Sequence, residues 1–229
     1  MINSSTIFIL LLLAIGLSFW AQFKVKGTFK RYAKVPSSFG LTGHDAARRM
    51  LDAHGLYDVP IEPVRGTLSD HYDPIKRVVR LSEPVYFESS ISAVAVACHE
   101  VGHAIQHKES YPMLVLRHKM FPIVNLTSQI SPFLILAGFL FGLFNLAGLG
   151  VAFFSLAVLF QLVTLPVEFD ASNRARREML NMGLVSQNEE QQVGKVLNSA
   201  ALTYVAAALI SLLELFRFVL ILLESRNQN

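Results

Sequence analysis

His99, Glu100 and His103 form an HExxH motif. On an α-helix, residues four positions apart project from the same face one turn apart, so both imidazoles can bind a single tetrahedral Zn²⁺. Glu100 then lies beside the metal, where its carboxylate can take a proton from zinc-bound water, whose pKa the metal lowers to about 7. The hydroxide can attack a peptide carbonyl, and the protonated Glu100 can pass the proton to the leaving amine. The motif therefore predicts zinc-dependent hydrolysis of peptide bonds.

The surroundings of the motif favour a metal site over a chance occurrence of five residues. Ser89 or Ser90 can cap a helix whose apolar residues recur at three- and four-residue spacing, and we expect this helix to span residues 90–107. The apolar stripe must be buried, which leaves both histidines at its rim. Gly102 leaves room for the close approach of another segment.

The composition is that of an integral membrane protein, because 52% of the 229 residues are hydrophobic. The net charge of +3 is modest, and no nucleic-acid partner is expected. Cys98 is the single cysteine, which excludes an internal disulfide. Adjacent residues point about 100° apart on a helix, so Cys98 is expected to pack in the core rather than bind the metal beside His99.

Four apolar stretches could cross a membrane, at residues 6–21, 121–144, 149–165 and 200–223. The first is expected to be an uncleaved anchor, because no Lys or Arg precedes it and no small-x-small cleavage site follows it. The fourth contains Glu214 and Arg217, which can pair at three-residue spacing and so lower the cost of burial. A helix lying in the membrane interface is the alternative for this stretch.

Basic residues follow the first and third apolar stretches. They are Lys24, Lys26, Lys30, Arg31 and Lys34, and then Arg174, Arg176 and Arg177. Cytoplasmic flanks carry an excess of Lys and Arg, so both clusters and the HExxH motif are expected on the cytosolic side, with the N-terminus outside. We therefore expect a multi-pass protein of the plasma membrane, in contact with the lipid bilayer, whose active site meets protein or peptide substrates in the cytosol, membrane proteins among them.

The polar region, residues 23–120, is predicted to be a small α+β catalytic region. Thr42 can cap an amphipathic helix over residues 43–54, and residues 61–68 and 76–81 are typical of two short strands joined as a β-hairpin. A strand just before an HExxH helix can offer its edge to an extended substrate.

Three residues between these strands are candidates for assisting catalysis or contacting the substrate: His71, Tyr72 and Asp73. The alternative is that a segment rich in Asp and Pro simply suits a turn. His107 lies about 12 Å along the helix from His99, too far to bind the same ion. We expect His118 to be structural.

A catalytic zinc needs a third protein ligand and an open position for water. Glu168 and Asp170 follow Pro166 at the start of a segment, residues 166–198, that is expected to be cytosolic and helical. The two carboxylates point about 160° apart on a helix, so at most one binds zinc directly. Glu168 is favoured; Asp170, a ligand elsewhere, or two solvated charges remain alternatives. One Zn²⁺ per chain is expected.

The sequence resembles the YugP-type neutral zinc metallopeptidases of bacterial membranes over nearly its whole length. The shared features are the apolar N-terminal stretch with its basic flank and the segments from Leu68 to Pro74, Val79 to Ser82, Cys98 to His107, and Pro166 to Ser172. The resemblance implies a gluzincin-like endopeptidase with a zincin-like site, in which the two histidines of the motif bind zinc and Glu100 is catalytic.

More distantly, the sequence is similar to the HtpX and CAAX prenyl protease group, in which a Glu-x-x-Ala-Asp helix supplies the third zinc ligand. Aligning that pattern puts the ligand on Glu168 and the small residue on Ala171. This sequence carries Ser172 where the pattern has Asp, so the contact to a histidine ligand falls to Ser172 or to Asp170.

Two other classes fit less well. A site-2-type intramembrane protease places HExxH inside a spanning helix, whereas the helix here is too short to span and is followed by polar residues. A non-hydrolytic zinc-binding scaffold or transporter is the alternative function, but it leaves Glu100 without a purpose. We find no internal repeat or linker, so residues 1–229 are expected to form one mainly α-helical, membrane-embedded domain.

Overall fold

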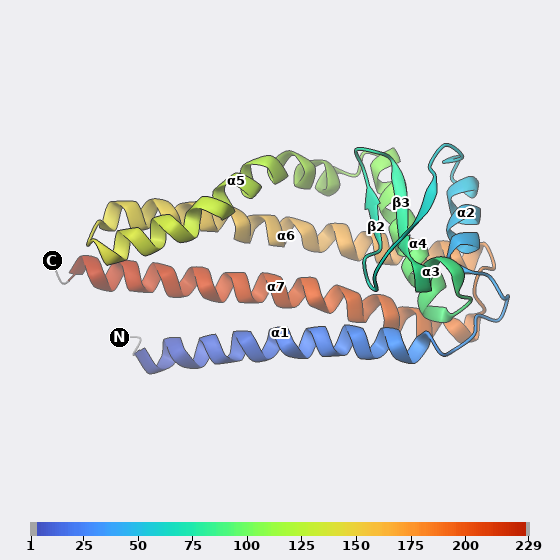
Figure 1. Ribbon diagram of the computed structural model, residues 1–229, viewed down its shortest axis with the longest axis horizontal. Coiled ribbons are helices and arrows are strands. Elements are labelled where there is room, and N and C mark those ends of the chain that lie inside the picture. Colours follow the sequence, from blue (N-terminus) through green and yellow to red (C-terminus); the bar gives the residue numbers. More distant parts are fainter. Residues whose placement is uncertain (1–3, 228–229) are drawn as a thin grey trace. The chain divides into compact units, whose positions relative to one another are not determined.

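The structure is a computed structural model that describes residues 4–227, and it is mainly helical with one small sheet (Figure 1). By their internal contacts the residues fall into two compact units. One unit comprises residues 1–21, 115–165 and 203–229, and the other comprises residues 22–114 and 166–202. The fold class expected from the sequence is confirmed, whereas the expectation of a single domain stays a prediction.

Four described helices are long and apolar enough to cross a membrane. They are α1 (Ser4–Tyr32), α5 (Pro112–Leu140), α6 (Phe144–Asn181) and α7 (Gln187–Asn227). One helix covers most or all of each apolar stretch found in the sequence, so the number and the order of the candidate spans are confirmed. The helices extend beyond the apolar stretches.

Residues 166–198, expected to be helical, are divided between two longer helices, and their expected cytosolic location stays a prediction. α6 continues through Pro166 to Asn181, and α7 is unbroken from Gln187 into the fourth apolar stretch. Gly183 has φ +62°, a left-handed conformation that ends the first helix. The turn after Asn181 therefore separates two long helices.

In the first unit, small residues allow close contact between α5 and α6. A Cβ built at Gly138 would lie 2.3 Å from the backbone nitrogen of Ala147, and Ser131 Oγ donates to the Gly150 carbonyl over 2.8 Å. Close backbone approach and hydrogen bonds of this kind stabilise helix pairs where no water is available. In α7, Arg217 Nε donates to Glu214 Oε2 over 3.0 Å, the pair expected from their spacing.

The second unit has an apolar core between helices α2 (Gly43–Ala53), α3 (Glu83–Phe87) and α4 (Ile91–Lys108) and the sheet. The buried face of α2 consists of Gly43, Ala46, Ala47, Met50 and Leu51. Thr42 caps this helix as predicted: its side chain accepts the Asp45 N–H over 3.1 Å, and the Asp45 carboxylate accepts the Thr42 N–H. The cap and the apolar face together fix α2 against α4.

The sheet has the order β1 (Ile61–Val64), β3 (Val78–Ser82), β2 (His71–Asp73). β1 is parallel to β3, and β2 is antiparallel to it. The hairpin is therefore formed by β2 and β3. The expected hairpin between residues 61–68 and 76–81 is wrong, because the strands found there, β1 and β3, are parallel to each other. Asp73 Oδ1 accepts the N–H groups of Ile75 and Lys76, which makes the tight turn between β2 and β3.

Because β3 is central, both of its edges are occupied. The strand just before the HExxH helix thus cannot offer an edge to a substrate, and the sheet edges belong to β1 and β2. The edge strand β2 contacts α4 directly, as Tyr72 Oη lies 2.9 Å from His107 Nδ1. β2 is the sheet edge that is fastened to the helix of the motif.

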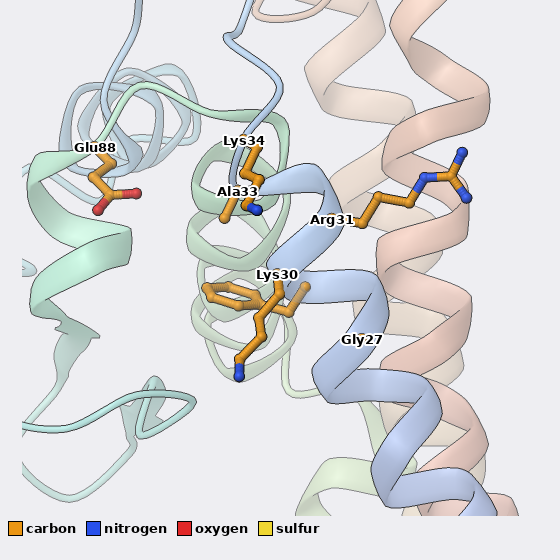
Figure 2. A pocket seen from close by; sticks show the side chains of 7 residues that line it. Gly27, Lys30, Arg31, Ala33, Lys34 and Glu88 are labelled. Carbon is orange, nitrogen blue, oxygen red and sulfur yellow. The ribbon is translucent and has the colours of Figure 1, made fainter.

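The end of α1 that belongs to this unit is basic. A hollow of about 700 Å³ is lined there by Gly27, Phe29, Lys30, Arg31, Ala33, Lys34 and Glu88. Figure 2 shows these lining residues. Lys30 and Lys34 lie on one side of the chain there, and Arg31 points to the other. Lys30 and Arg31 occupy the last turn of α1, where cations complement the helix dipole.

Gly43 is predicted to be intolerant of a side chain. A Cβ at this position would lie 2.1 Å from the Val85 carbonyl oxygen and 3.0 Å from that of Ala93, both of them backbone atoms that cannot rotate away. Gly43→Ala should lower the free energy of unfolding by roughly 1–3 kcal/mol, the usual penalty for overpacking a core. The measurement is thermal unfolding of the detergent-solubilised protein followed by circular dichroism.

Gly27→Ala is the matched control, since a Cβ on Gly27 of α1 meets nothing within 4 Å. It should be neutral or stabilising by up to about 1 kcal/mol, because alanine is the better helix former. Equal unfolding temperatures for the two variants would contradict the steric account.

Candidate metal centre

α4 presents the HExxH motif from a buried helix with a defined start. Ser90 is the N-cap, and its hydroxyl accepts the Ala93 N–H over 3.2 Å. The helix runs one residue later at each end than the range expected from the sequence. His99 and His103 lie one above the other on it, with ring centroids 4.8 Å apart.

Glu168 of α6 completes a cluster with the two histidines. Its Oε2 lies 3.3 Å from His99 Nε2 and 3.5 Å from His103 Nε2, and the three ligand atoms all lie within 4.8 Å of one another. Ligand atoms around a tetrahedral zinc with bonds of about 2.0–2.1 Å are separated by about 3.3 Å. Two imidazole nitrogens and one carboxylate oxygen at these separations are a donor set that fits a catalytic zinc.

The approach of Glu168 depends on two small residues where α4 meets α6. A Cβ built on Gly102 would lie 2.7 Å from the Ala171 carbonyl oxygen and 3.2 Å from its Cα. No residue larger than glycine therefore fits at position 102 without moving α6. This contact brings the carboxylate of Glu168 to the imidazoles. It is the close approach of another segment that was expected at Gly102.

The other ring nitrogen of each histidine also has a partner. His99 Nδ1 lies 3.1 Å from the hydroxyl of Ser172, and His103 Nδ1 lies 3.0 Å from Gln106 Oε1. Such contacts fix the orientation of a ligand imidazole. Of the two residues considered for this contact, the structure brings Ser172 to a histidine, whereas Asp170 accepts a hydrogen bond from Gln106 Nε2.

Glu100 is 8% exposed. Burial raises the pKa of its carboxyl group, because the charged form loses hydration, whereas a positive charge on His99 or His103 would lower it. A carboxyl group whose pKa lies above its usual range can carry a proton closer to neutral pH. Glu100 thus has the environment of a group that both accepts and returns a proton.

The chain matches a known protein family over most of its length. The family model described as "Putative neutral zinc metallopeptidase" matches residues 7–223. The chain belongs to this family. A curated relative from Bacillus subtilis (strain 168), named "Putative membrane protease YugP", is 64% identical over 216 residues, which is 94% of this chain and 96% of the relative. No solved structure matches the chain.

The family identity confirms the resemblance found in the sequence. It implies zinc as the metal, and the cluster of His99, His103 and Glu168 is a site that could hold it. The four apolar helices and the relative's name also indicate a membrane protein.

The remaining candidates of this zinc metallopeptidase lie outside the cluster. His71 and Tyr72 are on β2; His71 Nδ1 lies 2.9 Å from the Ser69 carbonyl oxygen, and Tyr72 contacts His107. His107 is not one of the three clustered residues, as expected from its distance along the helix. Cys98 is fully buried as predicted, and burial raises the pKa of its thiol to about 12, so the thiol stays protonated.

Gln106 is a residue of the site that sequence reasoning missed. It lies three positions after His103, a spacing that puts both side chains on one face of α4. That spacing was the available signal. The spacing does not predict the other partners of Gln106, because its amide also contacts Val167 and Asp170 of α6, which lie more than 60 residues away in the sequence.

Gly102→Ala should weaken zinc binding, because the added methyl group forces α4 and α6 apart between the histidines and Glu168. We expect the zinc Kd to rise about 10-fold or more, as when a ligand loses its positioning contacts. The measurement is competition with a chromophoric chelator.

Gly194→Ala on α7 is the control, since the three atoms nearest to its Cβ would belong to the flexible Arg176 side chain, the nearest of them at 3.5 Å, an ordinary van der Waals contact. This variant should keep the wild-type affinity. Unchanged zinc affinity in Gly102→Ala would show that the close approach is not needed for the site.

Proposed function

We propose that the chain is a membrane-anchored zinc endopeptidase that hydrolyses peptide bonds at the cytosolic face of the membrane. The observation that carries this proposal is the convergence of His99, His103 and Glu168, with Glu100 next to the first ligand on the same helix. A metal site without hydrolysis needs three ligands, but it does not need a buried carboxylate beside them.

The chemistry divides between the metal and this chain's residues. Zinc, when bound, supplies a Lewis acid that polarises the scissile carbonyl and makes water more acidic. Glu100 accepts the proton of the attacking water and returns it to the nitrogen of the leaving amine. Ser172 and Gln106 hold the two imidazoles in register with Glu168. The surrounding apolar core limits the access of bulk water to the buried carboxylates.

An extended stretch of substrate would suit the edge strand β2. Its backbone is paired with β3 on one side only, and peptides commonly bind by adding a strand to such an edge. Tyr72 fastens this edge to His107, one turn beyond the motif, so a peptide paired with β2 would run past α4. His71 and Tyr72 are accordingly proposed as residues near the substrate rather than as zinc ligands.

The distribution of charge supports a cytosolic site in the plasma membrane. The basic end of α1 (Figure 2) and the arginines of α6 both follow apolar spans, and cytoplasmic flanks favour such residues. This orientation leaves the N-terminus outside. The substrates are then proteins or peptides in the cytosol or at the inner membrane surface, including segments of membrane proteins.

Glu100→Gln should keep the bound zinc and lose the hydrolysis of an unfolded protein such as casein. General acid–base catalysis contributes about 10²–10⁴-fold, so the rate should fall by at least about 100-fold. The measurement pairs a fluorescent casein assay with elemental analysis of zinc in the same detergent-purified samples.

Glu88→Gln, which removes an exposed carboxylate from the hollow of Figure 2, is the control and should retain wild-type activity. If Glu100→Gln cleaved casein as fast as wild type, the peptidase mechanism would be refuted. A zinc-binding scaffold or transporter would then be the better reading.

Wild type is expected to bind one zinc per chain. Glu168→Gln should lower zinc affinity more than Asp170→Asn does, because Glu168 Oε2 lies between the two imidazole Nε2 atoms while Asp170 contacts neither. Removal of zinc with 1,10-phenanthroline should stop casein cleavage, and added zinc should restore it. A larger loss of affinity in Asp170→Asn would move the third ligand to that residue.

A further inference from the structure

We propose that Gln106 is a positioning residue that fixes the tautomer and orientation of His103, and that Asp170, Arg174 and Glu109 hold Gln106 in place. The proposal rests on His103 being a zinc ligand, as proposed above. It adds to the site a chain of four side chains that do not touch the metal.

Gln106 is completely buried, and its amide has a defined direction. Nε2 lies 2.8 Å from the Val167 carbonyl oxygen and 2.8 Å from Asp170 Oδ2. A backbone carbonyl and a carboxylate only accept hydrogen bonds, so both protons of the amide nitrogen are used. The reversed amide would set oxygen against oxygen, and leaving a buried polar group unsatisfied costs about 1–3 kcal/mol.

The direction of the amide fixes the imidazole in turn. Gln106 Oε1 faces His103 Nδ1 at 3.0 Å and can only accept, so Nδ1 must donate its proton. The lone pair is left on Nε2, the atom that lies 3.5 Å from Glu168 Oε2. This is the nitrogen that must be unprotonated to bind a metal.

The two histidines differ in this respect. Ser172, which faces His99 Nδ1 at 3.1 Å, has a hydroxyl group that can either donate or accept. That contact orients the His99 ring but does not select its tautomer. Gln106 therefore imposes on His103 a constraint that Ser172 does not impose on His99.

Charged groups anchor Gln106 from the far side. Asp170 Oδ2 also accepts from Arg174 Nε, and the guanidinium donates through a second nitrogen to Glu109 Oε2, each over 2.5 Å. Hydrogen bonds between ionised partners are about twice as strong as neutral ones. The negative charge of Asp170 also polarises the Gln106 amide, which strengthens its bond to the imidazole and makes Nε2 a better donor to a metal.

The same contacts join the two helices that carry the ligands. Gln106 belongs to α4 and Glu109 is its C-cap, while Val167, Asp170 and Arg174 belong to α6 on either side of Glu168. The chain of hydrogen bonds thus sets the distance between His103 and Glu168 as well as the direction of the imidazole. If the role of Gln106 were only structural, its buried amide would need hydrogen-bond partners, but those partners would not have to include a ligand histidine.

Gln106→Met tests the proposal, because methionine has a similar length but offers no amide to His103 or Asp170. We expect the zinc Kd to rise about 10–100-fold, the range seen when the partner of a ligand histidine is lost. The Co²⁺-substituted protein should also show a changed visible absorption spectrum, since the geometry at the ion changes. Both readouts are taken without substrate.

Ser92→Ala is the matched control on the same helix. Ser92 is fully buried and donates to the Phe29 carbonyl oxygen over 2.9 Å, away from the histidines. Its loss should lower the unfolding temperature while leaving the zinc Kd within about twofold of wild type, because distant sites act independently. A structural role for Gln106 would make Gln106→Met behave in the same way.

Asp170→Asn is a milder variant that decides the matter if Gln106→Met does not fold. It keeps an oxygen for Gln106 but loses the charge paired with Arg174, and the zinc Kd should rise several-fold. Glu190→Gln is its control, since it removes a carboxylate paired with another arginine of α6, Arg176, at 2.8 Å. Equal zinc affinities for these two variants would overturn the anchoring role of Asp170.

A wild-type zinc Kd and Co²⁺ spectrum in Gln106→Met would overturn the positioning role while the zinc site itself stands. If wild type bound no zinc, the metal centre and this proposal would both fail. The two failures are therefore distinguishable from the wild-type measurement.

Discussion

The close approach of α4 to α6 at Gly102 and Ala171 is the contact on which the candidate site depends. A Cβ on Gly102 would lie 2.7 Å from a backbone oxygen, so the helices touch through their main chains at that point. The ligand side chains of the two helices are therefore close together, and Glu168 Oε2 lies within 3.5 Å of the Nε2 atoms of both histidines. Backbone contact is rigid, because no side-chain rotation can relieve it.

Several polar side chains are buried in this region, and burial of a polar group without a hydrogen bond costs free energy. Gln106, Glu100, His103, Glu168 and Ser172 are all less than 9% exposed. Hydrogen bonds connect the imidazoles to Gln106 and Ser172, and connect Gln106 to the backbone of α6. Around the two imidazoles and Gln106, where these hydrogen bonds are made, a shift would leave a donor or acceptor unpaired, so that part of the site is held in one arrangement. The same bonds that stabilise the unit thus hold the geometry that chemistry needs.

The sheet contributes to the site by fixing the position of the helix that carries the HExxH motif. β3 enters the centre of the sheet and is followed by α3 and α4, so the start of the motif helix is fixed by the most buried strand. Asp70, just before β2, accepts the N–H and hydroxyl protons of Ser82 at the end of β3. Burial raises the pKa of the Asp70 carboxyl group. These contacts leave β2 as an edge strand held against α4.

The sequence by itself determined what depends on neighbours within one segment. The HExxH pair on a helix, the Thr42 cap and the four apolar spans follow from periods of a few residues, and the structure has each of them. Only the tertiary structure decided that Glu168 rather than Asp170 meets the imidazoles, that residues 71–73 form a strand, and that Gln106 faces His103. Each of these outcomes depends on contacts between elements. For Glu168 and Gln106 it is the direction of a side chain where α4 packs against α6, and for residues 71–73 it is the order of the strands in the sheet. Local periodicity does not encode that choice, because it is made by packing and hydrogen bonding between elements.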